Sequence, residues 1–160
     1  MKLQLKQLAA TFGLIGCLGM AAPAAVAGTD AHFKDADEAI EYRQAVFTLV
    51  KAHVGVMGAM VKGKMDYDAA EFAYRAESLK ALSNMPLEGF TYPGSDKGDT
   101  KAKAAVWKDM DGFKAKMEKF QSDSDALAEA AKAGSLDAAK PAFITTVKNC
   151  KACHKDYKNK

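Results

Sequence analysis

The feature that most constrains this chain is an apolar stripe that contains a cysteine and a histidine near the C-terminus. Its members recur at three- and four-residue steps, as on one face of a helix, and they are Phe143, Val147, Cys150, His154 and Tyr157. Cys150 and His154 therefore occupy positions where a helical bundle normally carries core side chains. A group bound by these two residues belongs inside such a bundle.

Three further segments carry the same helical period. The first has an apolar face that includes Arg43 and ends at Gly63; its apolar members are Ile40, Phe47, Val50, Val54, Met57 and Val61. The second is predicted from Asp68 to Met85, where Pro86 stops it. A third is predicted from near Lys101 to Ala131, with only Ser124 breaking its apolar series, and Gly134 ends it.

The connections between these segments complete the prediction. The stretch from Pro86 to about Thr100 is rich in Pro, Gly and Asp, so we expect a long loop there. The fourth helix starts after Ser135 and has Pro141 in its first turns. The sequence thus predicts an all-α protein, an antiparallel four-helix bundle.

A second stripe lies beside the first on the opening helix and widens its apolar surface. This stripe comprises Tyr42, Val46, Leu49, His53, Val56 and Met60. The extra width is explained equally well by a partner subunit or by a broad core.

The N-terminus has the pattern of a secretory signal peptide. Lys2 and Lys6 precede an apolar run that ends in small residues, and we expect cleavage after Ala27. The mature domain is then residues 28–160, exported to the periplasm. In the competing interpretation, Leu14 to Cys17 is a lipobox and Cys17 is a lipidated membrane anchor.

The mature chain offers no basic block that would indicate nucleic-acid binding. Its formal charge falls from +3 to about +1 once Lys2 and Lys6 are removed, counting the side chains that the interpretation above assigns to the mature domain. Its length suits one domain with a single core. An oxidising compartment requires an explanation for two cysteines that lie three residues apart.

That explanation is the form C-x-x-C-H of Cys150 to His154. Two thiols at this spacing add to the vinyl groups of haem, and the adjacent imidazole binds iron. A structural zinc site would need about four ligands, and only His32 and His53 remain to supply them. A thioredoxin-like pair would need a βαβ context and a helix N-terminus, which the motif lacks. We therefore predict one covalent haem c per chain, with His154 as the iron ligand.

A sixth iron ligand would have to come from upstream of the motif. The candidates are Met57, Met60, Met65, Met85, Met110, Met117 and His53. Methionines at helical spacing are more often core residues than ligands.

The sequence resembles the class II cytochromes, and within them the cytochrome c′ family, over nearly all of the mature chain. The matching pieces are Tyr42-Arg43-Gln44, Tyr67 to Ala70, Trp107, and Phe143 followed by the terminal CKACH. The resemblance implies a homodimer through the first two helices and a pentacoordinate high-spin haem that binds NO and CO in a buried distal pocket. It also implies that Arg43 and Gln44 lie near the haem propionates; the alternative for Arg43 is a solvated surface charge.

Two residues depart from the family pattern. Phe47, four residues after Arg43 on the same face, is expected to form the distal wall in place of a smaller aliphatic residue. Low-spin relatives carry a ligating Met there, and phenyl cannot bind iron. Lys158 stands where many members have Arg, and the two cations are not equivalent.

The expected function is a gas-binding haem protein rather than an enzyme, with NO sequestration or protection and an electron-transfer role. The alternative is a low-spin electron-transfer cytochrome with an internal sixth ligand. A peroxidase would need a distal acid or base, and Phe47 provides neither.

Overall fold

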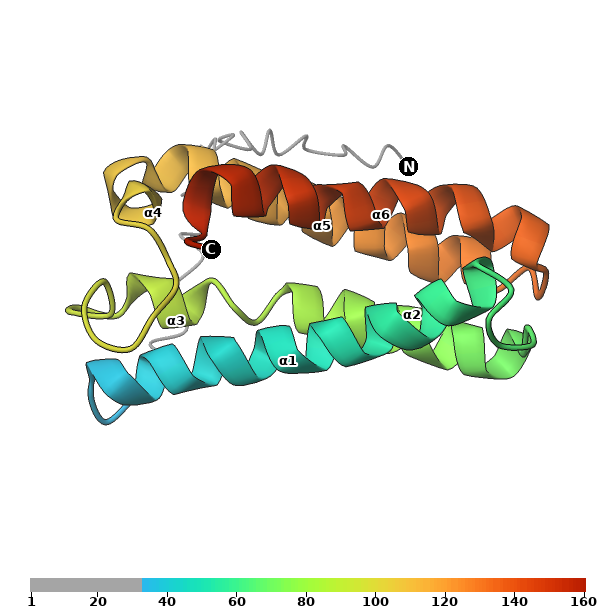
Figure 1. The fold of residues 1–160 in the computed structure, drawn as a ribbon, viewed down its shortest axis with the longest axis horizontal. Helices are drawn as coiled ribbons and strands as arrows, with labels where there is room; N and C mark the ends of the chain where they lie inside the picture. The colour runs from blue at the N-terminus through green and yellow to red at the C-terminus, as the bar shows by residue number, and fades with distance from the viewer. Residues whose placement is uncertain (1–32) are drawn as a thin grey trace, which may run out of the picture.

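The computed structural model describes residues 33–160, which form four long helices and two short ones (Figure 1). Their bounds are Ala36–Val61 (α1), Ala69–Ser83 (α2), Glu88–Thr91 (α3), Ala105–Lys108 (α4), Met110–Ala131 (α5) and Leu136–Tyr157 (α6). The predicted signal peptide and Cys17 lie outside the described residues.

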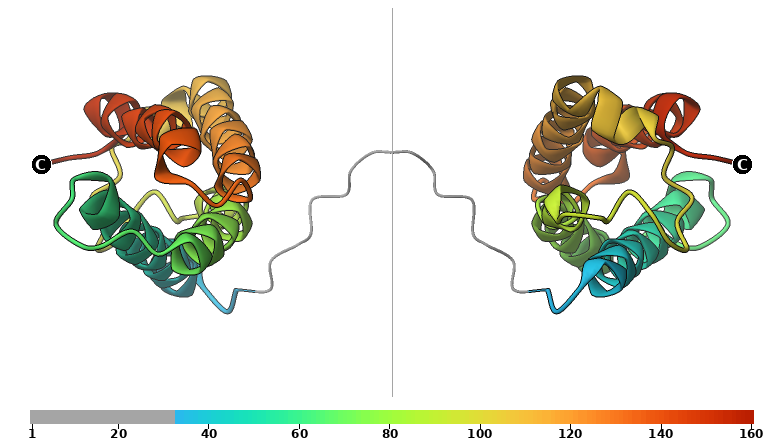
Figure 2. Two further views of the ribbon diagram at one scale, coloured as in Figure 1. Left: turned by 90° about the vertical axis from the view of Figure 1, so that its right-hand side faces the viewer. Right: turned by 90° about the vertical axis from the view of Figure 1, so that its left-hand side faces the viewer.

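The long helices run alternately up and down and form the predicted antiparallel bundle. Viewed end-on, they occupy the corners of a square in the order α1, α2, α5, α6 (Figure 2). Adjacent helices pack extensively with one exception: α1 and α6 touch each other least. The bundle is therefore loosest along the edge between its first and last helices.

Side-chain caps start each long helix. Asp35, Asp68, Asp109 and Ser135 each accept a hydrogen bond from the backbone N–H three residues later. Such caps satisfy N–H groups that have no partner within the helix. Gly63 and Gly134 adopt positive φ after α1 and α5, as helix-ending glycines do.

The predicted loop from Pro86 to Thr100 contains the short helix α3, which the sequence reasoning did not expect. α3 lies directly against α1, since a Cβ at Gly89 would approach the Ala39 carbonyl oxygen to 2.7 Å. Only glycine permits this close backbone approach.

The third helix begins later than the predicted Lys101, so that prediction was wrong. Residues 101–103 pair instead with the last residue of α6 and the residues after it: the N–H of Lys103 donates to Tyr157 O, and that of Asn159 to Lys101 O. The helix then starts with α4 and is interrupted at Asp109, where α5 begins. Pairing with a distant segment overrides the helical propensity of this Lys- and Ala-rich stretch.

The hydrophobic core includes residues from all four long helices. Phe72, Leu79, Leu127 and Ala139 are fully buried within it. Ser124, the polar break in the predicted stripe, is also fully buried, and its hydroxyl donates to the Phe120 carbonyl. A buried hydroxyl that is hydrogen-bonded in this way costs little.

Candidate haem-binding site

The cysteines and histidine of the C-x-x-C-H motif lie at the edge of the bundle rather than at its centre. Along the α6 stripe Phe143 is buried, Cys150 and Cys153 are half-buried, and His154 is exposed. The stripe turns inward again at Tyr157, which is 6% exposed. The expectation of a fully internal position for the motif is thus met only in part.

The two thiols and the imidazole of the motif are uncharged near neutral pH. Burial raises the pKa of both thiols, which favours the neutral thiol form. Burial and the nearby ammonium of Lys158 lower the pKa of His154, so the imidazole is neutral. A neutral imidazole has the lone pair that binding to iron requires.

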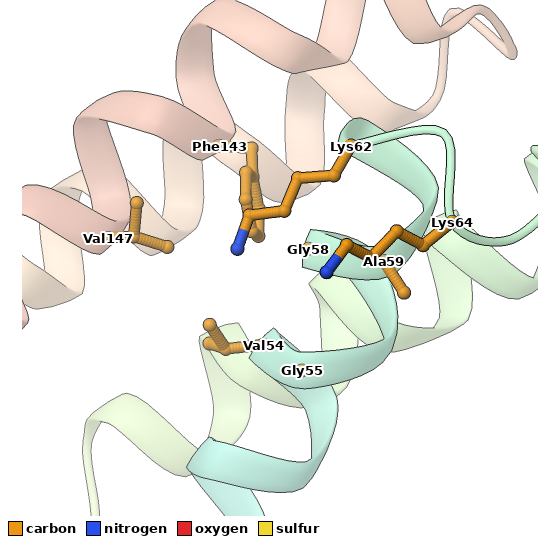
Figure 3. A pocket seen from close by; sticks show the side chains of 8 residues that line it. All are labelled: Val54, Gly55, Gly58, Ala59, Lys62, Lys64, Phe143 and Val147. Carbon is orange, nitrogen blue, oxygen red and sulfur yellow. The ribbon is translucent and has the colours of Figure 1, made fainter.

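A hollow of about 390 Å³ lies beside this motif, between α1 and α6 (Figure 3). It is lined by Val54, Gly55, Gly58, Ala59, Lys62, Lys64, Phe143 and Val147. Val147 is three residues before Cys150, on the adjoining turn of α6. Gly58 lines the hollow without a side chain. A Cβ added there would lie 3.5 Å from Phe143 Cζ, an ordinary contact distance, and would occupy part of this space.

Arg43 is 2% exposed, which rules out the solvated surface charge considered as its alternative. Its Nη1 donates to the Gly89 carbonyl at 2.7 Å, and its Nη2 donates to Ser95 O at 2.7 Å and Thr100 Oγ1 at 3.0 Å. The guanidinium also lies over the Phe90 ring, 4.3 Å from its centroid. Burial lowers the pKa of Arg43 to about 10, so it stays charged at neutral pH.

Gln44 and Phe47 lie on the same part of α1. The exposed Gln44 donates from Nε2 to the Asp99 carbonyl at 2.8 Å. Phe47 is half-buried, with its ring centroid 6.3 Å from that of Phe90. Steps of four and seven residues place Arg43, Phe47 and Val54 on one face of α1, and Val54 lines the hollow.

Asp109, which the sequence did not point to as a site residue, holds the end of α6 in place. Tyr157 donates its hydroxyl to Asp109 Oδ2 at 2.6 Å, while Oδ1 of the same carboxylate caps α5 through Gly112 N. Asp109 thus holds the turn that carries His154 against the start of α5. The signal available in the sequence was an Asp two residues before an Asp-Gly pair, typical of a helix start.

The candidate sixth ligands are scattered. Met57, Met60 and Met117 belong to the hydrophobic core, whereas Met65 and Met85 are exposed. His53 is half-buried with its ring 6.0 Å from that of Tyr74 on α2. His53 precedes Val54 by one residue, so it lies roughly 100° around the helix from the face that carries Val54.

The residues present fit a covalently attached haem. Two half-buried thiols lie one turn apart on a helix, a neutral imidazole follows directly, and an apolar hollow adjoins them. Together with the four-helix bundle, these features define a class of protein: a c-type cytochrome built on a helical bundle.

Comparison with known proteins identifies the family. The model of the family described as Cytochrome C′ matches residues 38–158. The chain belongs to the cytochrome c′ family, whose members are non-enzymatic haem proteins that carry haem c bonded covalently through the motif formed here by Cys150 and Cys153.

Individual relatives cover the same part of the chain. The cytochrome c′ of Rubrivivax gelatinosus is 43% identical over 129 residues, 80% of this chain and 99% of its own. The solved structure of the Shewanella frigidimarina protein has a TM-score of 0.77 at 50% identity, covering 80% of this chain and 99% of its own. Variants of the Alcaligenes xylosoxidans protein, solved with nitric oxide and with carbon monoxide, each have a TM-score of 0.74 at 40% identity and cover 80% of this chain and 98% and 99% of their own.

Proposed function

We propose that Cys150, Cys153 and His154 would hold the haem of this chain between α1 and α6, with His154 as its iron ligand, and that the sixth coordination position would be open to NO and CO. The observation that carries the proposal is Phe47, a side chain without a donor atom, on the α1 face that borders the hollow. Haem iron with one open position supplies the site for a diatomic gas. The NO and CO complexes of the Alcaligenes xylosoxidans relative support this function.

The chain's own residues have separate roles in this proposal. Phe47 limits the space on the distal side, and its half-buried ring excludes water from it. Arg43 has five N–H groups, and three of them donate hydrogen bonds to the 86–100 connection. The remaining N–H groups, together with the exposed Gln44, would orient the haem carboxylates. Asp109 holds the turn of His154 through Tyr157.

Optical and EPR spectra of the purified protein test the proposal, recorded oxidised and reduced, before and after adding CO and NO. High-spin spectra that change with each gas are the expected result. Low-spin spectra that do not respond to CO would instead mean an internal sixth ligand and an electron-transfer cytochrome. A buried methionine could supply that ligand only by leaving the core cluster, at a cost in packing.

We further propose a homodimer formed through α1 and α2. α1 is long and apolar enough to cross a membrane by length and composition alone, but it packs in the bundle on α2, α3 and α6. Only 22% of its most apolar 18-residue window is buried there, so much of its apolar surface has no partner within the described residues. Ala45, Leu49 and Ala52 are exposed and follow steps of four and three residues, and the half-buried Val56 is four residues further on. Leu49 is 50% exposed and Tyr74 of α2 is 60% exposed. A regular stripe of small and apolar residues suits helix packing against a second copy.

The protein is also proposed to be exported through cleavage of residues 1–27. Members of the family are typically periplasmic, and the charged start and small residues before Gly28 fit a signal peptidase site. The intact mass of the protein from the periplasmic fraction tests this: a chain beginning at Gly28 is expected, and a lipid-modified chain beginning at Cys17 would contradict it.

A further inference from the structure

Lysines border the opening between α1 and α6 on both sides. Lys62 and Lys64 line the hollow itself, and Figure 3 shows the ammonium of Lys62 extending from the end of α1 toward Phe143 and Val147. Lys51 is exposed three residues before Val54, hence on the same side of α1.

The α6 side of the opening carries three more lysines. Lys151 is one turn after Val147, so it shares the face of α6 that borders the hollow. Lys148 and Lys155 lie at adjoining positions, three before and four after Lys151, and all three are exposed. We refer to the six residues Lys51, Lys62, Lys64, Lys148, Lys151 and Lys155 as the lysine rim.

No lysine of the rim forms an ion pair within the described part of the chain. Ion pairs there involve other cations: Lys34, Arg75, Lys80, Lys116, Lys119 and Lys132. The one acid in the last turns of α6, Asp156, makes its ion pair with Lys116 of α5, and the charge of the neighbouring rim residue Lys155 also lowers its pKa. Unpaired like charges around an opening repel one another and attract anions.

Overall composition does not explain this cluster. Residues 33–100 carry eight basic and eleven acidic side chains, a net charge of −3, yet three of their six lysines belong to the rim. Residues 101–160 carry thirteen basic and eight acidic side chains, a net charge of +5. The rim therefore joins lysines from the acidic half and the basic half of the chain at one opening.

We propose that the lysine rim is the docking face for the carboxylate-rich surface of a protein that exchanges electrons with the haem. Lys151 lies between the two cysteines that bear the cofactor, so a partner on the rim lies next to its attachment. One electron passes from the reduced haem to the oxidised partner, and no bond or proton moves. Lys51 and Lys62 are eleven residues apart on one helix, roughly 16 Å. This length suits a protein surface better than a small anion.

The inference rests on the covalent haem but not on the open sixth position, so the two can fail separately. Low-spin spectra would contradict the gas-binding proposal and would leave the docking face to be tested as before.

The first test measures oxidation of the reduced holoprotein by stopped flow, with anionic hexacyanoferrate(III) and cationic tris(phenanthroline)cobalt(III) as probes. The anionic probe is expected to react more slowly as ionic strength rises, and the cationic probe faster. The Lys151→Glu/Lys155→Glu variant should slow hexacyanoferrate(III) about tenfold at low ionic strength. The Lys51→Glu/Lys62→Glu variant should do the same without touching the attachment motif, and haem attachment is checked by the pyridine haemochrome spectrum.

The matched control is Lys80→Glu/Lys132→Glu, which changes the net charge equally. These two lysines pair at the surface with Asp125 and Glu129, on α2 and α5 away from the opening. The rate for hexacyanoferrate(III) should change less than about twofold in this variant. Equal losses in the rim and control variants would overturn the proposal, since net charge alone would then explain the rate.

The second test measures binding without electron transfer. Calorimetry at low ionic strength should show that poly-L-glutamate binds the holoprotein, binds the control variant equally, and binds neither rim variant. Poly-L-glutamate should also slow the oxidation of the reduced holoprotein by hexacyanoferrate(III). If the oxidation rate instead saturates with hexacyanoferrate(III) while poly-L-glutamate neither binds nor competes, the docking proposal is overturned. The rim would then be a site for a small anion.

Discussion

At the scale of single residues, Phe47 sets how much room a gas has. A phenyl ring fixed beside Phe90 crowds the proposed distal side, and overpacking of this kind typically costs 1–3 kcal/mol. Phe47→Ala should therefore bind CO about tenfold more tightly, measured by titration of the ferrous protein. The CO affinity of Phe47→Leu should fall between those of the wild type and Phe47→Ala. Unchanged CO affinity in Phe47→Ala would mean that the ring is ordinary core packing.

The hydrogen bond from Tyr157 to Asp109 should make the stability of the protein depend on pH in the alkaline range. Its hydrogen bond to Asp109, and then its burial, raise its pKa from 10.0 to about 12. Because the folded state holds this proton more tightly than the unfolded chain, the stabilisation is complete below pH 10.0 and is lost as pH rises toward about 12.

Tyr157→Phe should lower the free energy of unfolding by about 1 kcal/mol at neutral pH, and the loss of stability above pH 10 should become shallower. Urea denaturation across this range measures both effects. Some decline should persist in the variant, since the pKa of Tyr42 is also raised to about 12 by burial and Glu88. A decline as steep as in the wild type would contradict the role given to Tyr157.

At the scale of elements, the outer face of α1 determines assembly. Leu49→Glu places a charge in the stripe proposed to meet a second copy and should convert the dimer to a monomer, measured by sedimentation velocity. Ile144→Glu is the control, because Ile144 is 40% exposed on α6, away from this stripe. Dissociation in both variants, or in neither, would count against an interface on α1.

The four long helices could be predicted from the sequence because each keeps an apolar period for many turns, and the first three are followed by Gly63, Pro86 and Gly134. The short helix α3 could not, since four residues give no measurable period. Helix α4 falls within the helix predicted from near Lys101, but the interruption at Asp109 that separates it from α5 was not expected. The start predicted at Lys101 was wrong because the deciding partner, the chain around Lys158, lies far away in sequence.

The prediction for the site shows the same limit. Cys150, Cys153 and His154 form a contiguous motif, so their chemistry was readable without a structure. Arg43 interrupts an apolar stripe, which indicated burial, but its partners in the 86–100 connection had no local signal. The lysine rim was equally hidden, because it joins α1 to α6.

At the scale of the whole molecule, the haem would join α1 and α6, the two adjacent long helices that contact each other least. Cys150→Ser/Cys153→Ser cannot hold haem covalently and leaves the hollow of about 390 Å³ between α1 and α6 without its attached group. Its thermal midpoint should fall by roughly 10 °C or more, measured by circular dichroism. The thermal midpoint of Cys153→Ser, which keeps one thiol, should lie between those of the double variant and the holoprotein. A midpoint equal to that of the holoprotein would show that the bundle does not depend on its cofactor.

The buried guanidinium of Arg43 has a consequence for the order of folding. Its hydrogen-bond partners lie 46, 52 and 57 residues further along the chain. Closing loops of that length has an entropic cost that must be met before these bonds form. The helical hairpin of α1 and α2 involves shorter separations and should form early. The 86–100 connection should then be among the last segments to acquire protection from hydrogen exchange during refolding.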